Sequence, residues 1–196
     1  MKLADHPTVR AYKEKSINSP KPSTLLESAR LKLMAQNAGA DDAGVIDLSR
    51  KTMAEYRPDV LDAMHDTQSI MVLVFRVNQM HLRSLAHSVA DYEFKQVWTY
   101  ANHIARQIVI KLQRNGIKAL NMPVGFPYEA TRWPGKMWLT CDKVFAIEAG
   151  MGQMGYNRLV LHPTYGAAIV IGSILLANTC DQYDQPLVFN PCMECG

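Results

Sequence analysis

Continuous and periodic runs of apolar residues predict most of the regular structure in this chain. Residues 69–77 (SIMVLVFRV) are apolar and rich in β-branched side chains, which is typical of a strand covered on both of its faces. The other predicted strands cover 44–48, 117–122, 158–162 and 167–178. The last two flank a turn at 163–166 and are expected to form a late β-hairpin.

Helical periodicity fills the intervals between these strands. The longest helix is expected over 82–115, with Gly116 as its stop signal. Its apolar residues repeat at spacings of four, three, four and four and form one buried stripe: Val97, Ala101, Ile104, Ile108 and Leu112. Shorter helices are expected over 58–65, with Pro58 in the first turn, and over 137–149.

A further helix is predicted near the N-terminus. It begins at Thr24, which forms a capping box with Glu27, and it ends at Gly39. Its apolar face is expected to hold Leu26, Ala29 and Leu33. Helices that alternate with strands, followed by an antiparallel component, predict the α/β (α+β) fold class, with a mixed sheet flanked by helices.

Composition narrows the class of protein without naming a function. The chain has 196 residues, which corresponds to one domain, and 48% hydrophobic and 20% charged residues exclude a disordered chain. No apolar run reaches the roughly 18–20 residues that a membrane span requires. The net charge of +3 gives no reason to expect a nucleic-acid partner. Residues 1–21 lack the apolar segment of a signal peptide, so a cytoplasmic location is expected.

A dense glycine cluster follows the predicted helix 137–149. It contains Gly150, Gly152 and Gly155, and it is no dinucleotide fingerprint, because that motif follows a strand. Glycines so closely spaced indicate positive φ angles or close approach of another group. Two interpretations stand: a helix C-cap with a tight turn, or a surface on which a planar cofactor lies against the backbone.

The cysteines give a second chemical signal. Cys192 and Cys195 form a Cys-x-x-Cys pair, which can share a metal or a cluster. A thioredoxin-type pair would sit at a helix start, and a zinc ribbon would need a second pair, which Cys141 and Cys180 do not provide. The pair is therefore either the first half of a ferredoxin-type motif or a loose pair of thiols.

Residues 142–196 resemble the cobalamin-binding region of reductive dehalogenases and epoxyqueuosine reductases. The shared order is a helix, the sequence Ala-Gly-Met-Gly, another Gly, a short strand, a Pro-x-x-Gly turn and a second strand. A spacer at 184–187 (DQPL) then leads to 190–196 (NPCMECG). The resemblance implies a nitroreductase-like fold that holds a base-off corrinoid, with iron–sulfur clusters beside it.

The resemblance also implies site residues. Those expected against the corrinoid are Gly150, Met151, Gly152, Gly155, His162, Pro163 and Gly166. Cys192 and Cys195 would be the first two ligands of a 4Fe–4S cluster. Tyr100, or else Tyr92, would be the proton donor on the long helix. The implied domains are a lead-in at 1–23, the corrinoid-binding domain at 24–180 and an incomplete iron–sulfur segment at 181–196.

Three departures from the family pattern bear on activity. The third and fourth cysteines of the first cluster motif do not occur, so the chain is expected to be part of a larger catalytic unit. Val170 stands where reductive dehalogenases commonly have a basic residue. Asp142 lies too close to the glycines to match the catalytic aspartate of epoxyqueuosine reductases.

The first functional hypothesis is a corrinoid- and iron–sulfur-dependent reductase, or its corrinoid-binding part. Its partners would be a small-molecule substrate and an electron donor, and the chain is expected to be able to pair as a homodimer. The alternatives are a non-catalytic corrinoid-binding or carrier module and a flavin-binding protein of nitroreductase type, because one fold serves several functions.

Overall fold

Strand β2 (Ser69–Arg76) lies at the centre of the structure, a computed structural model that describes residues 6–11, 25–125 and 140–193. Seven of its eight residues are buried. It pairs with β1 (Asp42–Asp47) on one side and with β6 (Ile169–Leu176) on the other. Strand β3 (Ala119–Asn121) completes the order β1-β2-β6-β3, and all three ladders are antiparallel.

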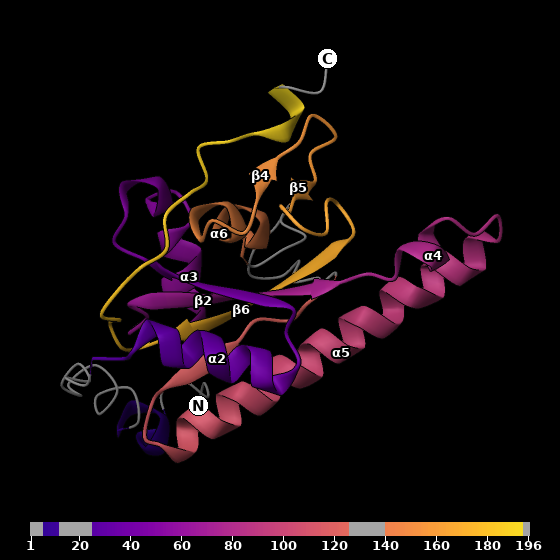
Figure 1. Ribbon diagram of the computed structural model, residues 1–196. Helices are drawn as coiled ribbons and strands as arrows, with labels where there is room; N and C mark the ends of the chain where they lie inside the picture. Colours follow the sequence, from indigo (N-terminus) through magenta and orange to yellow (C-terminus); the bar gives the residue numbers. More distant parts are fainter. Residues whose placement is uncertain (1–5, 12–24, 126–139, 194–196) are drawn as a thin grey trace.

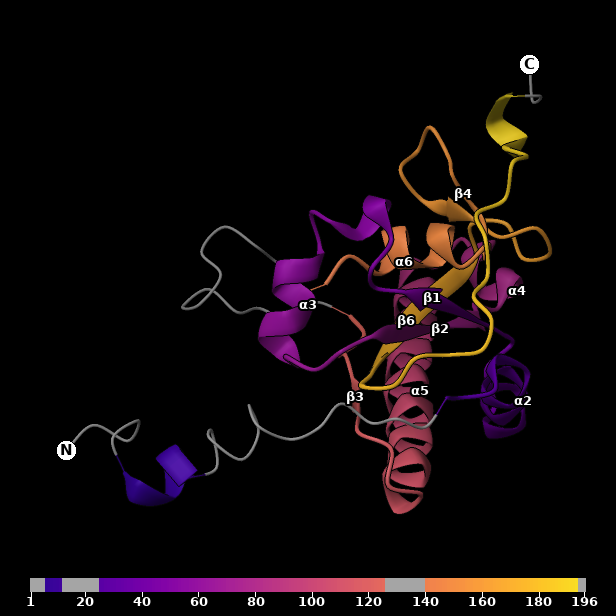
Figure 2. The same cartoon turned by 90° about the vertical axis from the view of Figure 1, so that its left-hand side faces the viewer.

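The sheet is the middle of three layers. Alternate residues of β2 point to opposite faces, so Met71, Leu73 and Phe75 enter one apolar core while Ile70, Val72 and Val74 enter the other. Helices α2 (Ser28–Ala38) and α5 (His87–Arg114) cover the first face, and α3 (Arg57–Ala63) and α6 (Asp142–Glu148) cover the second (Figures 1 and 2). The double coverage explains why all the residues of β2 from position 70 to 75 are apolar.

The remaining elements are short. They are η2 (Lys51–Met53), α4 (Gln79–Leu82), β4 (Gln153–Met154), β5 (Val160–Leu161) and η3 (Pro191–Met193). The predicted fold class, α/β (α+β) with helices flanking a sheet, is confirmed, and the four-stranded sheet is antiparallel instead of mixed. No helix within the described residues is both long and apolar enough to cross a bilayer.

The long helix is confirmed in its buried stripe and corrected at its start. All five predicted stripe residues are buried, and Gly116 ends α5 with a φ of 75°. The helix begins at His87 instead of residue 82, since a separate turn, α4, precedes it. Local polar groups cause the break: the Asn78 side chain accepts from the Met80 N–H, and the Ser84 hydroxyl accepts from the Ala86 N–H.

The N-terminal helix differs more from its prediction. Helix α2 begins at Ser28, and Glu27 occupies the N-cap without a side-chain hydrogen bond; Thr24 lies outside the described residues. The buried face holds Ser28, Leu31 and Ala35, while Leu33 is 56% exposed. The Ser28 N–H is bound at 2.8 Å by Oδ1 of Asp181. A carboxylate from the far end of the chain therefore replaces the predicted local cap.

The late β-hairpin was predicted between the wrong strands. Strand β5 pairs with β4, and β6 crosses instead to the main sheet between β2 and β3. Only His162 and Gly166 pair across the turn at 163–166. The reason is burial: seven of the eight β6 residues are apolar or glycine, and a two-stranded hairpin cannot cover both faces of such a strand.

The other predicted elements are confirmed with shifted bounds. The strand predicted over 44–48 begins two residues earlier as β1, and the one over 117–122 shortens to β3. The helix predicted over 58–65 is α3, with Pro58 in its first turn. The helix predicted over 137–149 is described from Cys141 onward as α6, and residues 126–139 lie outside the described part.

Leu73→Ala tests the central position of β2. Leu73 is fully buried between β2 and the α2–α5 layer, so its truncation is expected to lower the free energy of unfolding by about 3 kcal/mol. Leu85→Ala is the matched control, because Leu85 is fully exposed, and its effect should stay within about 0.5 kcal/mol. Urea denaturation measures both. Equal effects would contradict the doubly covered strand.

Candidate cofactor-binding site

The glycine turn, residues 150–155, begins as the C-cap of α6. Gly150 has a φ of 69°, its N–H binds the Ile147 carbonyl, and the Met151 N–H binds the Ala146 carbonyl. These two bonds form a Schellman motif, which requires a left-handed residue. A Cβ at Gly150 would lie 2.5 Å from the Gln185 carbonyl oxygen. The cap geometry and the approach of the C-terminal segment together explain this glycine.

The next two glycines serve the β4–β5 hairpin. Gly152 has a φ of 154°, and a Cβ there would lie 2.5 Å from the Leu161 carbonyl oxygen. A Cβ at Gly155 would lie 2.8 Å from Oδ1 of Asn157 and 3.0 Å from Leu161. The close approach predicted from the glycine spacing is therefore present, and the approaching groups belong to the chain itself. Contact of this turn with a corrinoid stays a prediction.

His162 anchors the proline turn, residues 163–166, to strand β1. Its Nδ1 accepts from the backbone N–H groups of Thr164 and Tyr165, at 3.1 and 3.4 Å. Because Nδ1 accepts, the proton of the neutral ring lies on Nε2, which donates to Oδ2 of Asp42 at 3.1 Å. His162 is buried. Both nitrogens are thus engaged within the chain, and His162 positions the turn.

The proline turn forms one wall of a cavity of about 450 Å³. Tyr165 stacks on the His162 ring, with centroids 4.8 Å apart and planes 22° apart. Gly166 has a φ of 58°, and no atom lies within 4 Å of the place a Cβ would take. The cavity is lined by Arg76, Val77, Asn78, Gln79, Glu93, Tyr165 and Ala168. These residues come from the end of β2, the start of α5 and the loop before β6.

The structure does not bring the predicted proton donors to the glycine turn. Tyr100 lies on α5, packs edge-on against Phe75 at 5.9 Å, and donates from its hydroxyl to the Gly39 carbonyl at 3.3 Å. It therefore lies on the α2–α5 face, whereas the glycine turn follows α6 on the other face. Val170 pairs with Phe75 in the sheet and is buried in the same apolar core. Tyr92 is 63% exposed near the start of α5.

The cysteine pair is described only in part. Cys192 is half-buried in η3, and its N–H binds Oδ1 of Asn190 at 3.0 Å; Cys195 lies outside the described residues. Burial raises the pKa of the Cys180 thiol to about 11, so that thiol is a poor nucleophile and ligand. Among the described residues, no group of three or more His, Cys, Asp or Glu side chains is placed to hold a metal ion.

Solved structures match the fold of this chain, whereas no family model and no curated protein matches its sequence. A reductive dehalogenase, whose structure suggests a mechanism for B12-dependent dehalogenation, matches 81% of this chain with a TM-score of 0.61 and 14% identity. The epoxyqueuosine reductase of Streptococcus thermophilus matches 85% with a TM-score of 0.53 and 16% identity. This chain has the fold that these two kinds of reductase share.

The matched proteins are longer than this chain. It spans 20% of the reductive dehalogenase and 50% of the epoxyqueuosine reductase. The resemblance that residues 142–196 carry is thus confirmed at the level of the fold, and it extends over most of the described residues.

Asp142 has a buried carboxyl with a raised pKa, which the sequence did not predict. It begins α6 and faces strand β6, where its Oδ1 accepts from the Ser173 hydroxyl at 2.7 Å and from Thr140 at 3.5 Å. Burial raises the pKa of this carboxyl to about 6, although both hydroxyls act to lower it. In sequence, an aspartate in the first turn of a helix indicates only a favourable interaction with the helix dipole.

Asp142→Asn tests this burial through the pH dependence of stability. The folded carboxyl holds its proton up to about pH 6, whereas the ordinary value is 3.8, so the folded state binds more protons between these values. The wild-type free energy of unfolding should therefore fall, relative to that of the variant, as the pH rises from about 4 to about 6. Urea unfolding across this range measures the difference, and a constant difference would contradict the raised pKa.

Proposed function

We propose that this chain is the corrinoid-binding part of a reductase system, and that the cavity beside the proline turn receives one edge of the cofactor. The observation that carries the proposal is the open face at Gly166 next to a polar cavity, within a reductase-type fold. The matched reductive dehalogenase performs B12-dependent dehalogenation. When bound, a corrinoid supplies a low-valent cobalt for reduction.

The residues of the cavity fit the rim of a corrinoid. That rim carries amide side chains, which both donate and accept hydrogen bonds. Asn78 and Gln79 offer amides, Arg76 a donor and Glu93 an acceptor. A cavity of about 450 Å³ suits a drug-sized group, so it takes an edge or the nucleotide tail of a corrinoid and leaves the rest against the outer surface of the turn.

The wall against which the ligand packs is held by hydrogen bonds from strand β1. Asp42 fixes the His162 ring, His162 fixes the backbone of the turn, and Tyr165 stacks on His162. Glu93 binds the Asn78 N–H at 2.8 Å, which fixes the opposite wall. A site whose walls are fixed before binding loses less conformational entropy when the ligand enters.

A binding role without its own catalysis is the form of this proposal that the geometry favours. The Tyr100 hydroxyl is engaged by the Gly39 carbonyl, and Val170 lies in the apolar core where the family pattern has a basic residue. For the iron–sulfur cluster, a 4Fe–4S centre takes four thiolates. Of the cysteines in the described part of the chain, only Cys192 lies in η3, and we derive no electron-transfer step from it.

Ala168→Leu tests the cavity. Ala168 is buried and lines the cavity, so three added carbon atoms should fill part of it and weaken hydroxocobalamin binding at least about tenfold. Ala167→Leu is the matched control, because Ala167 is exposed in the same loop, and its affinity should equal that of the wild type. Anaerobic titration followed by the cobalamin absorption spectrum gives the dissociation constants.

Thermal unfolding of both variants shows that each is folded before the affinities are compared. A wild-type chain that binds flavin mononucleotide and no cobalamin would overturn the proposal in favour of a flavin protein. Equal cobalamin affinity in all three proteins would show that the cofactor lies elsewhere on the fold. Reduction of an added substrate by the cobalamin-loaded chain alone would contradict the purely binding role.

A further inference from the structure

The C-terminal strap, residues 179–190, crosses the open edge of the sheet (Figures 1 and 2). It starts beside α2, where Leu26 and Cys180 form a bridge and Asp181 binds the N-terminus of the helix. It ends beside β4, where the Asn190 side chain donates to the Met154 carbonyl at 3.2 Å. The strap therefore connects the edge strand β1 to the glycine turn.

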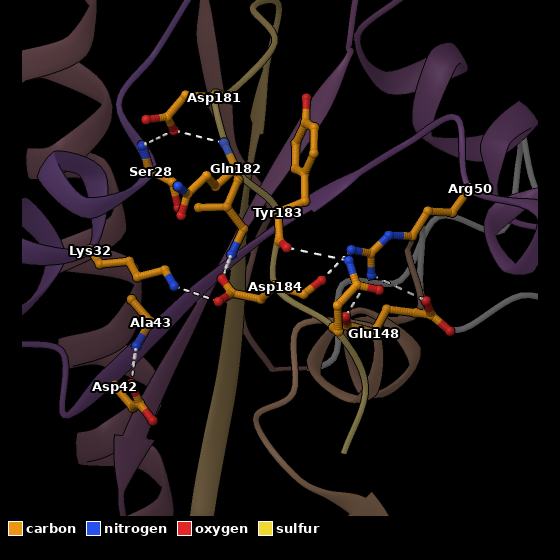
Figure 3. Close-up of polar contacts among 12 residues, drawn as sticks. Ser28, Lys32, Asp42, Ala43, Arg50, Glu148, Asp181, Gln182, Tyr183 and Asp184 are labelled. Carbon is orange, nitrogen blue, oxygen red and sulfur yellow. Dashed lines mark hydrogen bonds and ion pairs between the residues drawn. The ribbon is translucent and has the colours of Figure 1, made fainter. Parts of the chain in front are cut away.

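Asp184 gives the strap its attachment to β1. Its N–H donates to the Val45 carbonyl at 2.9 Å, and its Oδ2 accepts from the Val45 N–H at 2.8 Å. Its Oδ1 is 2.5 Å from Nζ of Lys32 on α2 (Figure 3). One aspartate thus satisfies the outward backbone groups of an edge residue and forms an ion pair with the neighbouring helix.

Arg50 joins the strap to the end of α6. Its Nη1 donates to the Glu148 carbonyl at 2.7 Å and lies 3.4 Å from the Glu148 carboxylate, while its Nη2 donates to the Asp184 carbonyl (Figure 3). The side chains of Arg50 and Glu148 are only 15% and 10% exposed. Charge-assisted bonds in such a setting are stronger than those at an exposed surface.

The strap, the glycine turn and β1 approach one another closely at two glycines, Gly150 and Gly44. The Gln185 carbonyl, next to Asp184, occupies the space that a Cβ of Gly150 would take. A Cβ at Gly44 of β1 would lie 2.9 Å from the Cβ of Ala149. The end of α6 is therefore enclosed between β1 and the strap, and Arg50 binds the carbonyls on both sides of this contact.

We infer that Arg50 is a positioning residue that couples the strap to the glycine turn, so that the two segments open and close as one unit. A corrinoid bears on this coupling only if the proposed function holds and the cofactor also reaches the glycine turn, as the family resemblance implies; the coupling itself is a property of the chain. By linkage, a ligand that stabilises the closed glycine turn also stabilises the attached strap. A partner that detaches the strap lowers the affinity for that ligand by the same factor. The segment that carries Cys192 would thereby regulate the cofactor site.

Arg50→Gln tests the coupling through amide hydrogen exchange of the ligand-free chain. Loss of the charge-assisted bonds is expected to speed exchange roughly ten- to hundredfold, to the same extent in peptides covering 150–155 and 183–190. Lys118→Ala is the matched control, because its 2.8 Å ion pair with Asp66 lies away from the strap; exchange in both peptides should be unchanged. Faster exchange at 183–190 alone would overturn the inference.

A milder variant keeps the test decisive if Arg50→Gln does not fold. Lys32→Met removes only the ion pair to Asp184 and leaves Arg50 in place, so it should speed exchange in both peptides together by a smaller factor. A change limited to the strap would again contradict the coupling.

Cobalamin separates this inference from the proposed function. Added hydroxocobalamin should slow exchange at 183–190 in the wild type and bind about tenfold more weakly to Arg50→Gln. Binding of equal strength to both proteins overturns the regulation of the cofactor site by the strap, while the proposed function stands. Coupled exchange without any cobalamin binding supports the coupling and rejects the proposed function.

Discussion

Burial of β2 on both faces is the constraint on which the other layers depend. An eight-residue strand with seven buried positions needs a helix layer on each side and a paired strand at each edge. The chain meets the first need with α2 and α5 on one face and α3 and α6 on the other. It meets the second by bringing β6 back from the late part of the sequence, which leaves β1 and the three-residue strand β3 as the edges of the sheet.

Covering the β1 edge determines the geometry of the candidate site. Exposed edge strands invite pairing with other chains, and here Asp184 binds the backbone of Val45 in place of a further strand. The strap that carries Asp184 then passes so near the end of α6 that only glycine fits at position 150. The glycine at position 150 therefore serves the closure of the fold, whereas the Cβ position at Gly166 in the proline turn is open.

The wall of the cavity is attached to the sheet, and the core beneath it is apolar. The His162–Asp42 contact ties the proline turn to β1, so the cavity wall is as rigid as the sheet. In the same apolar core as the cavity residues Val77 and Ala168, the side chains of Phe75 and Val170 fill the region beneath Tyr100. The residue best suited to hold a proton near neutral pH is Asp142, which lies on the α6 side.

The sequence alone determined the features that depend on neighbouring residues. The apolar run 69–77 predicted β2, the periodic stripe predicted α5, and the order of glycines, turn and cysteines predicted the reductase-type fold. Patterns of this kind are readable because strand and helix periodicity are local properties.

Only the tertiary structure decided what depends on distant parts of the chain. Asp181 caps α2 from 153 positions away, β6 leaves its predicted hairpin partner for β2, and the Gln185 carbonyl approaches Gly150. In each case the neighbouring residues in the sequence do not identify the partner. The choice among them follows from which apolar surfaces must be buried together, and that is settled only when the whole chain folds.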